Sequence, residues 1–138
     1  MIVLPWVVAC SATSLPIGEV FTSNTCHINE EGVSLISDKK ELVNTIKRLH
    51  YGSVGKENYV IPTVNFDEYN VYIISMGRKR TAGYAIQLTD QNADYRHGVV
   101  DLPVKLITPS QKGVLAQVIT SPCKIITLPK GDYKQVKM

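Results

Sequence analysis

"VYIISMGRKRTAGYAIQL", residues 71–88, carries the strongest structural signal in the chain. Its first six residues, Val71–Met76, form a short apolar run rich in branched side chains, which predicts a central strand buried on both faces. Tyr84–Thr89 alternates between apolar and polar residues and predicts a half-exposed strand. We expect these two strands to pair with each other through the Gly77–Gly83 turn that joins them.

A single helix is predicted about residues 38–50, before this region. Asp38 can cap the helix, and Glu41 stands three residues later at the capping-box position. Apolar residues then recur on one face at helical spacing, namely Leu42, Val43, Ile46 and Leu49. The segments Gly18–Ser23 and Gly32–Ile36 predict two strands that precede the helix.

Residues after the central region also have the character of strands. Val99–Thr108, Val114–Thr120 and Lys124–Leu128 predict three of them, and residues 90–96 predict a loop. Pro103 cannot donate to a sheet, so the first of these strands should be an edge strand or contain a bulge.

These elements predict an α+β fold with a mostly antiparallel, sandwich-like β-sheet and one amphipathic helix. We assign residues 17–130 to a single domain. Residues 1–16 would be the remnant of a lipoprotein signal and a linker, and residues 131–138 would be a frayed polar tail.

Composition excludes some classes of protein. The 138 residues suit one domain, and 15 cations against 12 anions give a net charge of +3, far below the basic surface of a dedicated DNA-binding protein. No run of 18 apolar residues exists, which excludes a transmembrane helix.

The N-terminal stretch has two interpretations. Val7–Cys10 has the form of a bacterial lipobox, in which Cys10 would be lipidated and would attach the protein to a membrane. No Lys or Arg precedes Cys10, however, and an edge strand with a buried thiol is the alternative. If Cys10 is lipidated, Cys26 and Cys123 remain as an even pair that can form a disulfide, although two separately buried thiols would fit the sequence equally well.

The sequence contains no convincing catalytic or metal-binding pattern. His27, His50 and His97 lack the spacing of zinc ligands, and neighbouring Cys26 and His27 would point to opposite faces of a strand. Gly52–Glu57 resembles a phosphate loop but is too short and follows a helix instead of preceding one. We therefore expect no enzyme activity, no metal and no cofactor.

Three consecutive cations, Arg78, Lys79 and Arg80, have three interpretations. They can keep a hairpin tip soluble, contact a protein partner, or bind the phosphates of a nucleic acid. The aromatic residues are not interleaved with glycine on a strand as in RNA-binding domains, which argues against nucleic acid.

Three segments together resemble the C-terminal domain of the protease complex subunit PrcB: Val64–Asp67, Gly77–Ile86 and Thr120–Lys130. The resemblance covers about residues 30–130. The chain departs from the family pattern at Ala82, where a glycine is usual, and at Cys123, where an aromatic residue is frequent. We expect Ala82 to have an ordinary conformation and Gly83 to adopt the special backbone geometry of the turn.

The resemblance implies a non-catalytic protein of the cell envelope, often lipid-anchored, or a secreted one, which serves as an accessory subunit of a surface protease. Its partner-binding residues would then lie in the turn, namely Arg78, Lys79, Arg80, Thr81, Gly83 and Tyr84. The Tyr84 ring would pack against the partner, and Arg78 and Arg80 would pair with carboxylates at the rim of the interface.

Two other functions are open. The Thr81–Tyr84 turn also resembles the loop that chagasin-like inhibitors insert into cysteine peptidases, although the preceding Asn-Pro is missing. A structural lipoprotein domain without a dedicated partner is the third possibility.

Overall fold

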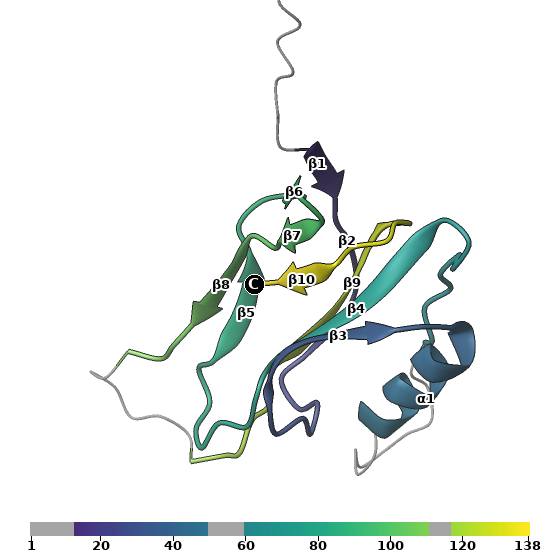
Figure 1. Ribbon diagram of the computed structural model, residues 1–138. Helices are drawn as coiled ribbons and strands as arrows, with labels where there is room; N and C mark the ends of the chain where they lie inside the picture. The colour runs from purple at the N-terminus through teal and green to yellow at the C-terminus, as the bar shows by residue number, and fades with distance from the viewer. Residues whose placement is uncertain (1–12, 50–59, 111–116) are drawn as a thin grey trace, which may run out of the picture.

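The structure, a computed structural model, describes residues 13–49, 60–110 and 117–138 (Figure 1). Ten strands and one helix occur in these ranges, and the strands form a four-stranded central sheet, a second four-stranded sheet and a two-stranded sheet. The α+β prediction with one helix and mostly antiparallel strands is confirmed. Cys10 and His50 lie outside the described residues, so the lipobox interpretation stays a prediction.

The central sheet is built around β4 (Tyr69–Met76), which lies between β3 (Glu31–Ile36) and β9 (Cys123–Pro129). The outermost strand β2 (Gly18–Ser23) pairs with β9, and every pairing in the sheet is antiparallel. All side chains of β4 from Val71 onward are buried. The predicted central strand is therefore confirmed, because the apolar run has protein on both of its faces.

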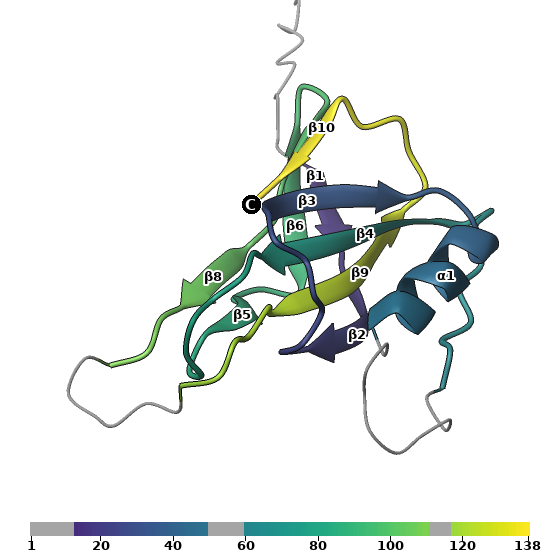
Figure 2. The ribbon, with the colours of Figure 1, turned by 90° about the horizontal axis from the view of Figure 1, so that it is seen from below.

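Helix α1 (Lys39–Leu49) covers one face of the central sheet (Figure 2). It begins as the sequence predicted, because the Asp38 carboxylate accepts a hydrogen bond from the Glu41 amide at 2.8 Å. The Glu41 carboxylate in turn accepts hydrogen bonds from the amide and hydroxyl of Ser37, at 2.8 and 2.6 Å. The buried stripe of the helix consists of Leu42, Thr45, Ile46 and Leu49.

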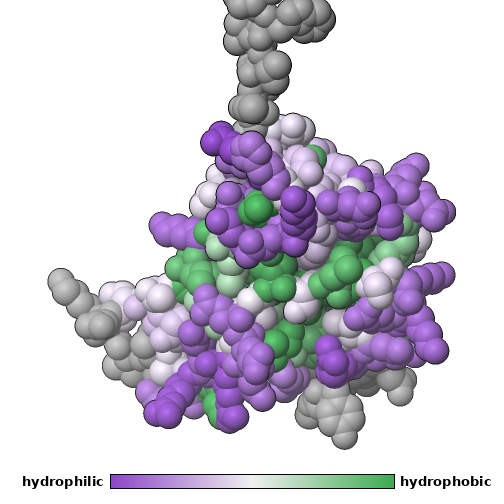
Figure 3. Space-filling model, viewed as in Figure 1, coloured by the Kyte–Doolittle hydropathy of each residue, from purple (hydrophilic) through white to green (hydrophobic). Residues whose placement is uncertain are grey.

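The central sheet separates two hydrophobic cores. Side chains alternate along a strand, so Val71 and Ile73 of β4 pack toward the helix while Tyr72 and Ile74 pack toward the other strands. A band of apolar side chains crosses the middle of the face seen in Figure 3, flanked by polar ones above and below. The partly buried residues of the second core include Val33, Ile86, Leu88, Val104 and Val136.

The second sheet contains β1 (Thr13–Pro16), β6 (Asn92–Arg96), β7 (Val99–Asp101) and β10 (Gln135–Lys137) in that order. It corrects three predictions. Residues 90–96 are not simply a loop, because β6 pairs with both β1 and β7. Likewise, β1 belongs to the fold and not to a linker. Nor is the polar tail frayed, since β10 pairs in parallel with β7 and its Val136 packs against the second core.

Strand β5 (Ala85–Leu88) pairs with β8 (Val104–Ile107), and not with β4 as the sequence predicted. The physical reason is that both edges of β4 are already occupied, by β3 and β9. The segment between β4 and β5 therefore connects two sheets and is not a hairpin turn. The cations within it do not lie at a hairpin tip.

Two further strand predictions need correction. The predicted strand Val99–Thr108 is divided into β7 and β8 at Leu102 and Pro103, where proline was expected to disturb the ladder. The predicted strand Val114–Thr120 is not formed over residues 117–119, and Thr120 makes only an isolated bridge; residues 114–116 lie outside the described ranges.

Candidate functional site

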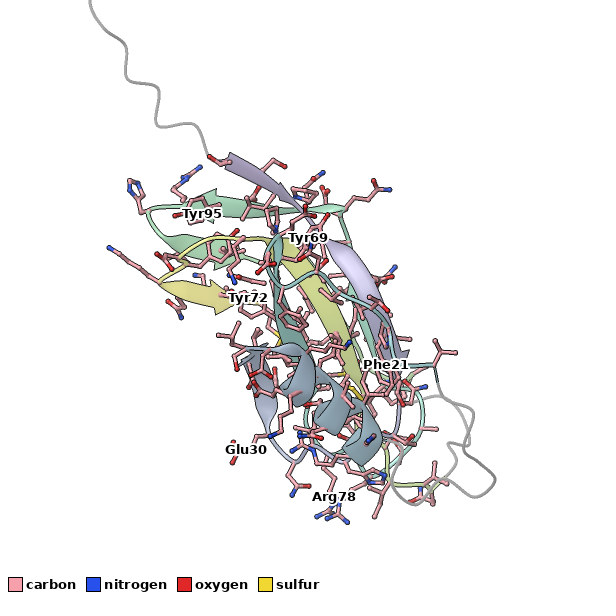
Figure 4. The ribbon with its side chains drawn as sticks, turned by 90° about the vertical axis from the view of Figure 1, so that its right-hand side faces the viewer. Phe21, Glu30, Tyr69, Tyr72, Arg78 and Tyr95 are labelled. Atoms are coloured by element: carbon pink, nitrogen blue, oxygen red, sulfur yellow. A yellow bond between two sulfur atoms is a disulfide. The ribbon has the colours of Figure 1, made fainter. Side chains whose placement is uncertain are left out.

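The predicted partner-binding residues lie in the connection between β4 and β5, at the lower end of the molecule in Figure 1. Arg78 and Arg80 are exposed, whereas Lys79, Thr81 and Tyr84 are half-buried. Figure 4 shows Arg78 and Glu30 at this end of the molecule and Tyr95 at the opposite end.

The connection is fixed to the rest of the fold by main-chain hydrogen bonds. The Lys79 amide donates to the Thr120 carbonyl at 2.7 Å, and the Thr120 amide donates to the Lys79 carbonyl at 2.9 Å. The Thr120 hydroxyl donates to the Thr81 carbonyl at 2.9 Å. Because these bonds tie the connection to the residues just before β9, its side chains are presented on a rigid support.

Gly83 adopts the special geometry that the sequence predicted. Its φ is +98°, and a Cβ atom at this position would lie 2.7 Å from the Cβ of Pro109. Ala82 does not have a positive φ, in agreement with its ordinary conformation in the prediction. Glycine is thus required at position 83 both for its backbone conformation and for the close approach of Pro109.

The side chain of Lys79 lies over the ring of Tyr84. The Lys79 ammonium lies 5.3 Å from the centroid of the Tyr84 ring, within the range of a cation–π interaction. Among the described residues, the ion pairs join Lys124 to Glu19 and Lys137 to Asp101, so none of the three cations of the connection is in one. Arg78 and Arg80 are therefore the two exposed positive charges that the connection offers.

A hollow of about 390 Å³ lies beside the connection, with Arg78, His27 and Ile119 among its lining residues. Ser121 forms part of its wall and is locked in place: its hydroxyl donates to the Ile28 carbonyl at 2.7 Å and accepts from the Ile28 amide at 2.9 Å. His27 has a φ of +58°, a left-handed conformation that is uncommon for a residue other than glycine.

A disulfide between Cys26 and Cys123 holds this region together, with 6.0 Å between their Cα atoms. The sequence left open whether Cys26 and Cys123 form a disulfide or are two separately buried thiols, and the structure contains the disulfide. The bond lies next to the hollow, since Thr25 and His27 flank Cys26 and line it. The Cys26 amide also donates to the Ser121 carbonyl at 2.9 Å.

Two large apolar side chains next to the hollow are exposed, Val118 at 50% and Ile119 at 60%. Sequence reasoning missed them, because adjacent apolar residues on a strand would point to opposite faces and one of them would be buried. Both are exposed in the structure, where residues 117–119 are not in a strand and this alternation does not apply. No signal in the sequence alone would have revealed this exposure.

Neither a metal site nor a membrane-spanning helix is found in the part of the chain that the structure describes. No group of three His, Cys, Asp or Glu side chains there could hold a metal ion. Within the same residues, no helix is both long and apolar enough to cross a membrane.

Part of the chain matches a known protein family. Residues 71–129 match the family model described as PrcB C-terminal, and the matched segment runs from within β4 to the end of β9. This confirms the resemblance found in the sequence. No curated protein and no solved structure matches the chain.

Proposed function

We propose that this chain, whose residues 71–129 match the PrcB C-terminal family, is a non-catalytic protein-binding domain that serves as an accessory subunit of a surface or secreted protease. The protein would act in the cell envelope or outside the cell. Its disulfide supports this location, because disulfides persist in oxidising compartments and are rare in the cytosol.

One observation carries the proposal: the exposed apolar side chain of Ile119 lines the same hollow as the exposed Arg78, next to main-chain hydrogen bonds that fix the connection. Val118 and Ile119 directly precede Thr120 in the chain. The main chain of Thr120 is hydrogen-bonded to that of Lys79, the residue that lies between Arg78 and Arg80 in the sequence. Solvent-exposed apolar residues next to arginine are typical of the centre and rim of protein interfaces.

The chemistry of the surface indicates the kind of partner that it would bind. A partner would cover Val118 and Ile119 with apolar side chains and place carboxylates opposite Arg78 and Arg80. Because hydrogen bonds already fix the main chain of Lys79 and Thr120, little main-chain entropy would be lost on binding.

The experiment is affinity capture of envelope proteins, followed by reconstitution with the purified protease that is retained. Ile119→Ala and Arg78→Ala should each weaken the reconstituted complex by more than about 1 kcal/mol, a factor of roughly five. Leu35→Ala is the matched control for Ile119, because Leu35 is 54% exposed but lies elsewhere, and Lys105→Ala is the matched exposed cation. Equal weakening by the control variants would contradict the proposal.

Inhibition assays against papain-type and subtilisin-type proteases separate the alternatives. A stable complex without inhibition supports the accessory subunit. Nanomolar inhibition of a papain-type enzyme, lost on changing Thr81 or Tyr84, would instead support a chagasin-like inhibitor. If no protease is retained at all, the structural lipoprotein domain becomes the better interpretation.

A further inference from the structure

A second hollow, of about 280 Å³, lies near the start of β4, whereas the β4–β5 connection follows the end of that strand. It exists because the two neighbours of β4 differ in length. On one side β9 pairs with β4 as far as Tyr69, but on the other side β3 ends at Ile36, opposite Val71. The sheet edge is therefore notched beside Tyr69 and Asn70, where the chain leaves β3 to begin α1.

The far wall of the hollow is the turn after β9, and it is tied to the sheet. The Asn70 side-chain amide donates to the Gly131 carbonyl at 2.8 Å and to the Tyr72 hydroxyl at 3.3 Å. The Tyr133 hydroxyl donates to the Pro129 carbonyl. These bonds fix the walls of the hollow, and small-molecule sites are usually preformed in this way.

Aromatic rings are concentrated in this hollow. The chain has seven Tyr, two Phe and one Trp, and four of these line it, namely Phe66, Tyr69, Tyr72 and Tyr133. Tyr72 and Tyr133 are fixed by packing in the second core, and the Tyr133 ring contacts that of Tyr95 edge-on at 5.3 Å. Tyr69 is 40% exposed, so its ring remains available for contact with a ligand (Figure 4).

The polar groups of the hollow favour a neutral ligand rich in hydrogen-bonding groups. Lys130 and Asp132 line it with one charge of each sign, so it has no excess charge to attract an anion or a cation. Asn70 already donates both amide hydrogens within the protein, which leaves its carbonyl oxygen as an acceptor. Burial raises the pKa of the Tyr72 phenol, so the hydroxyl keeps its proton and can donate it.

The size of the hollow limits the ligand further. A volume of about 280 Å³ is slightly below the range of pockets that enclose drug-sized molecules, so a single ring fits better than a larger compound. A ligand with one apolar face, a rim of hydroxyl groups and no charge has the chemistry of a sugar.

We propose that this hollow binds one residue of a neutral glycan, with the C–H face of the sugar on the Tyr69 ring. The sugar hydroxyls donate hydrogen bonds to the side-chain oxygen of Asn70 and to the Asp132 carboxylate, and they accept one from the Tyr72 hydroxyl. This site is separate from the surface around Arg78 and does not depend on the function proposed for that surface.

The test is a titration of the ¹⁵N-labelled chain, followed by amide chemical shifts, with the methyl glycosides of glucose, galactose, mannose and N-acetylglucosamine. At least one glycoside should give saturable millimolar shifts in residues 69–72 and 130–133. Tyr69→Ala should weaken this binding about tenfold, which corresponds to about 1.4 kcal/mol for the lost stacking contact. Tyr69→Phe keeps the ring and should retain binding, and Asp132→Ala should weaken it.

Tyr84→Ala is the matched control, because it removes a half-buried tyrosine in the connection between β4 and β5, outside this hollow, and should leave sugar binding unchanged. The proposal is wrong if none of the four glycosides gives saturable shifts in these residues, or if Tyr69→Ala binds as well as the unmodified chain. It is also wrong if a proline-rich peptide shifts the same amides and the sugars do not, since the hollow would then be a peptide site.

Discussion

Reduction of the Cys26–Cys123 disulfide should remove a large share of the stability of this fold. The two cysteines are 97 positions apart, and the chain-entropy relation assigns a loop of about this length a stabilisation of about 4 to 5 kcal/mol. Domains of this size have unfolding free energies of about 5 to 15 kcal/mol in total. With a urea dependence of about 2 kcal/mol per molar, the unfolding midpoint should fall by about 2 M.

Three samples separate the cross-link from the side chains that form it. The oxidised and reduced forms of the unmodified chain contain the same atoms except for two hydrogens, so their difference measures the bond itself. The double variant Cys26→Ala/Cys123→Ala also loses two sulfur atoms from residues that are each 1% exposed. It should therefore be less stable than the reduced chain by about a further 1 to 2 kcal/mol.

Thiol alkylation of the denatured, non-reduced chain provides the control. In protein prepared without lipid attachment, only Cys10 of the three cysteines should react before reduction and all three after it, as read from the mass of the product. Alkylation of three thiols before reduction would show that the disulfide does not form in solution. If the bond is intact in the oxidised sample and its reduction shifts the unfolding midpoint by less than about 0.5 M, the entropy argument is refuted.

Three further predictions concern single residues. Gly83→Ala should destabilise the fold by more than about 1 kcal/mol in urea unfolding, because of its positive φ and the Pro109 contact, and Ala82→Gly should change it much less. Glu19→Gln should cost about 1 to 3 kcal/mol in the same assay, because the nearly buried Lys124 ammonium loses the negative charge of its partner, which lies at 2.6 Å, whereas Lys124→Met should be close to neutral. Hydrogen bonds from Ser37 lower the pKa of Glu41. The stability that the ionised Glu41 contributes is therefore present above about pH 4.5 and is lost as the pH falls through the lowered pKa. Glu41→Gln should remove this contribution to the pH dependence of the unfolding free energy in acid.

The elements that could be predicted from the sequence are those whose signal is local. Val71–Met76 is apolar and contains no charged residue, which favours a buried segment, and its length and branched side chains indicate a strand. The start of α1 is specified by Asp38 and Glu41, and both make the expected contacts. The positive φ of Gly83 was also predicted locally, because alanine at position 82 resists such a conformation and glycine does not.

The parts that could not be predicted depend on contacts between distant segments. Nothing local reveals that β3 and β9 occupy both edges of β4 and so direct β5 to β8. Strand β6 has a polar sequence, and of its five residues only Ala93 is fully buried. The sequence did contain one local signal for the hairpin of β6 with β7, namely Gly98. In the structure His97 and Gly98 form the two-residue turn of this hairpin, with positive φ angles of 53° and 81°.

The same distinction applies to the candidate site. The motif drew attention to Arg78, Arg80 and Tyr84. It did not reveal that the exposed Ile119, which follows the exposed Val118, lines the same hollow as Arg78. Their position depends on the pairing of Lys79 with Thr120, which joins segments 41 positions apart. Whether these residues bind a partner stays a prediction until the capture experiment is done.

The Cys26–Cys123 bond also determines the covalent topology of the chain, which is a closed ring from residue 26 to residue 123 with an arm at each end. The ring contains α1 and the strands from β3 to β8. A single peptide-bond cleavage anywhere in the ring opens it but releases no fragment, so the chain keeps its full mass on a non-reducing gel. For a protein proposed to work beside a protease, two cuts in the ring would be needed before any part of it is lost.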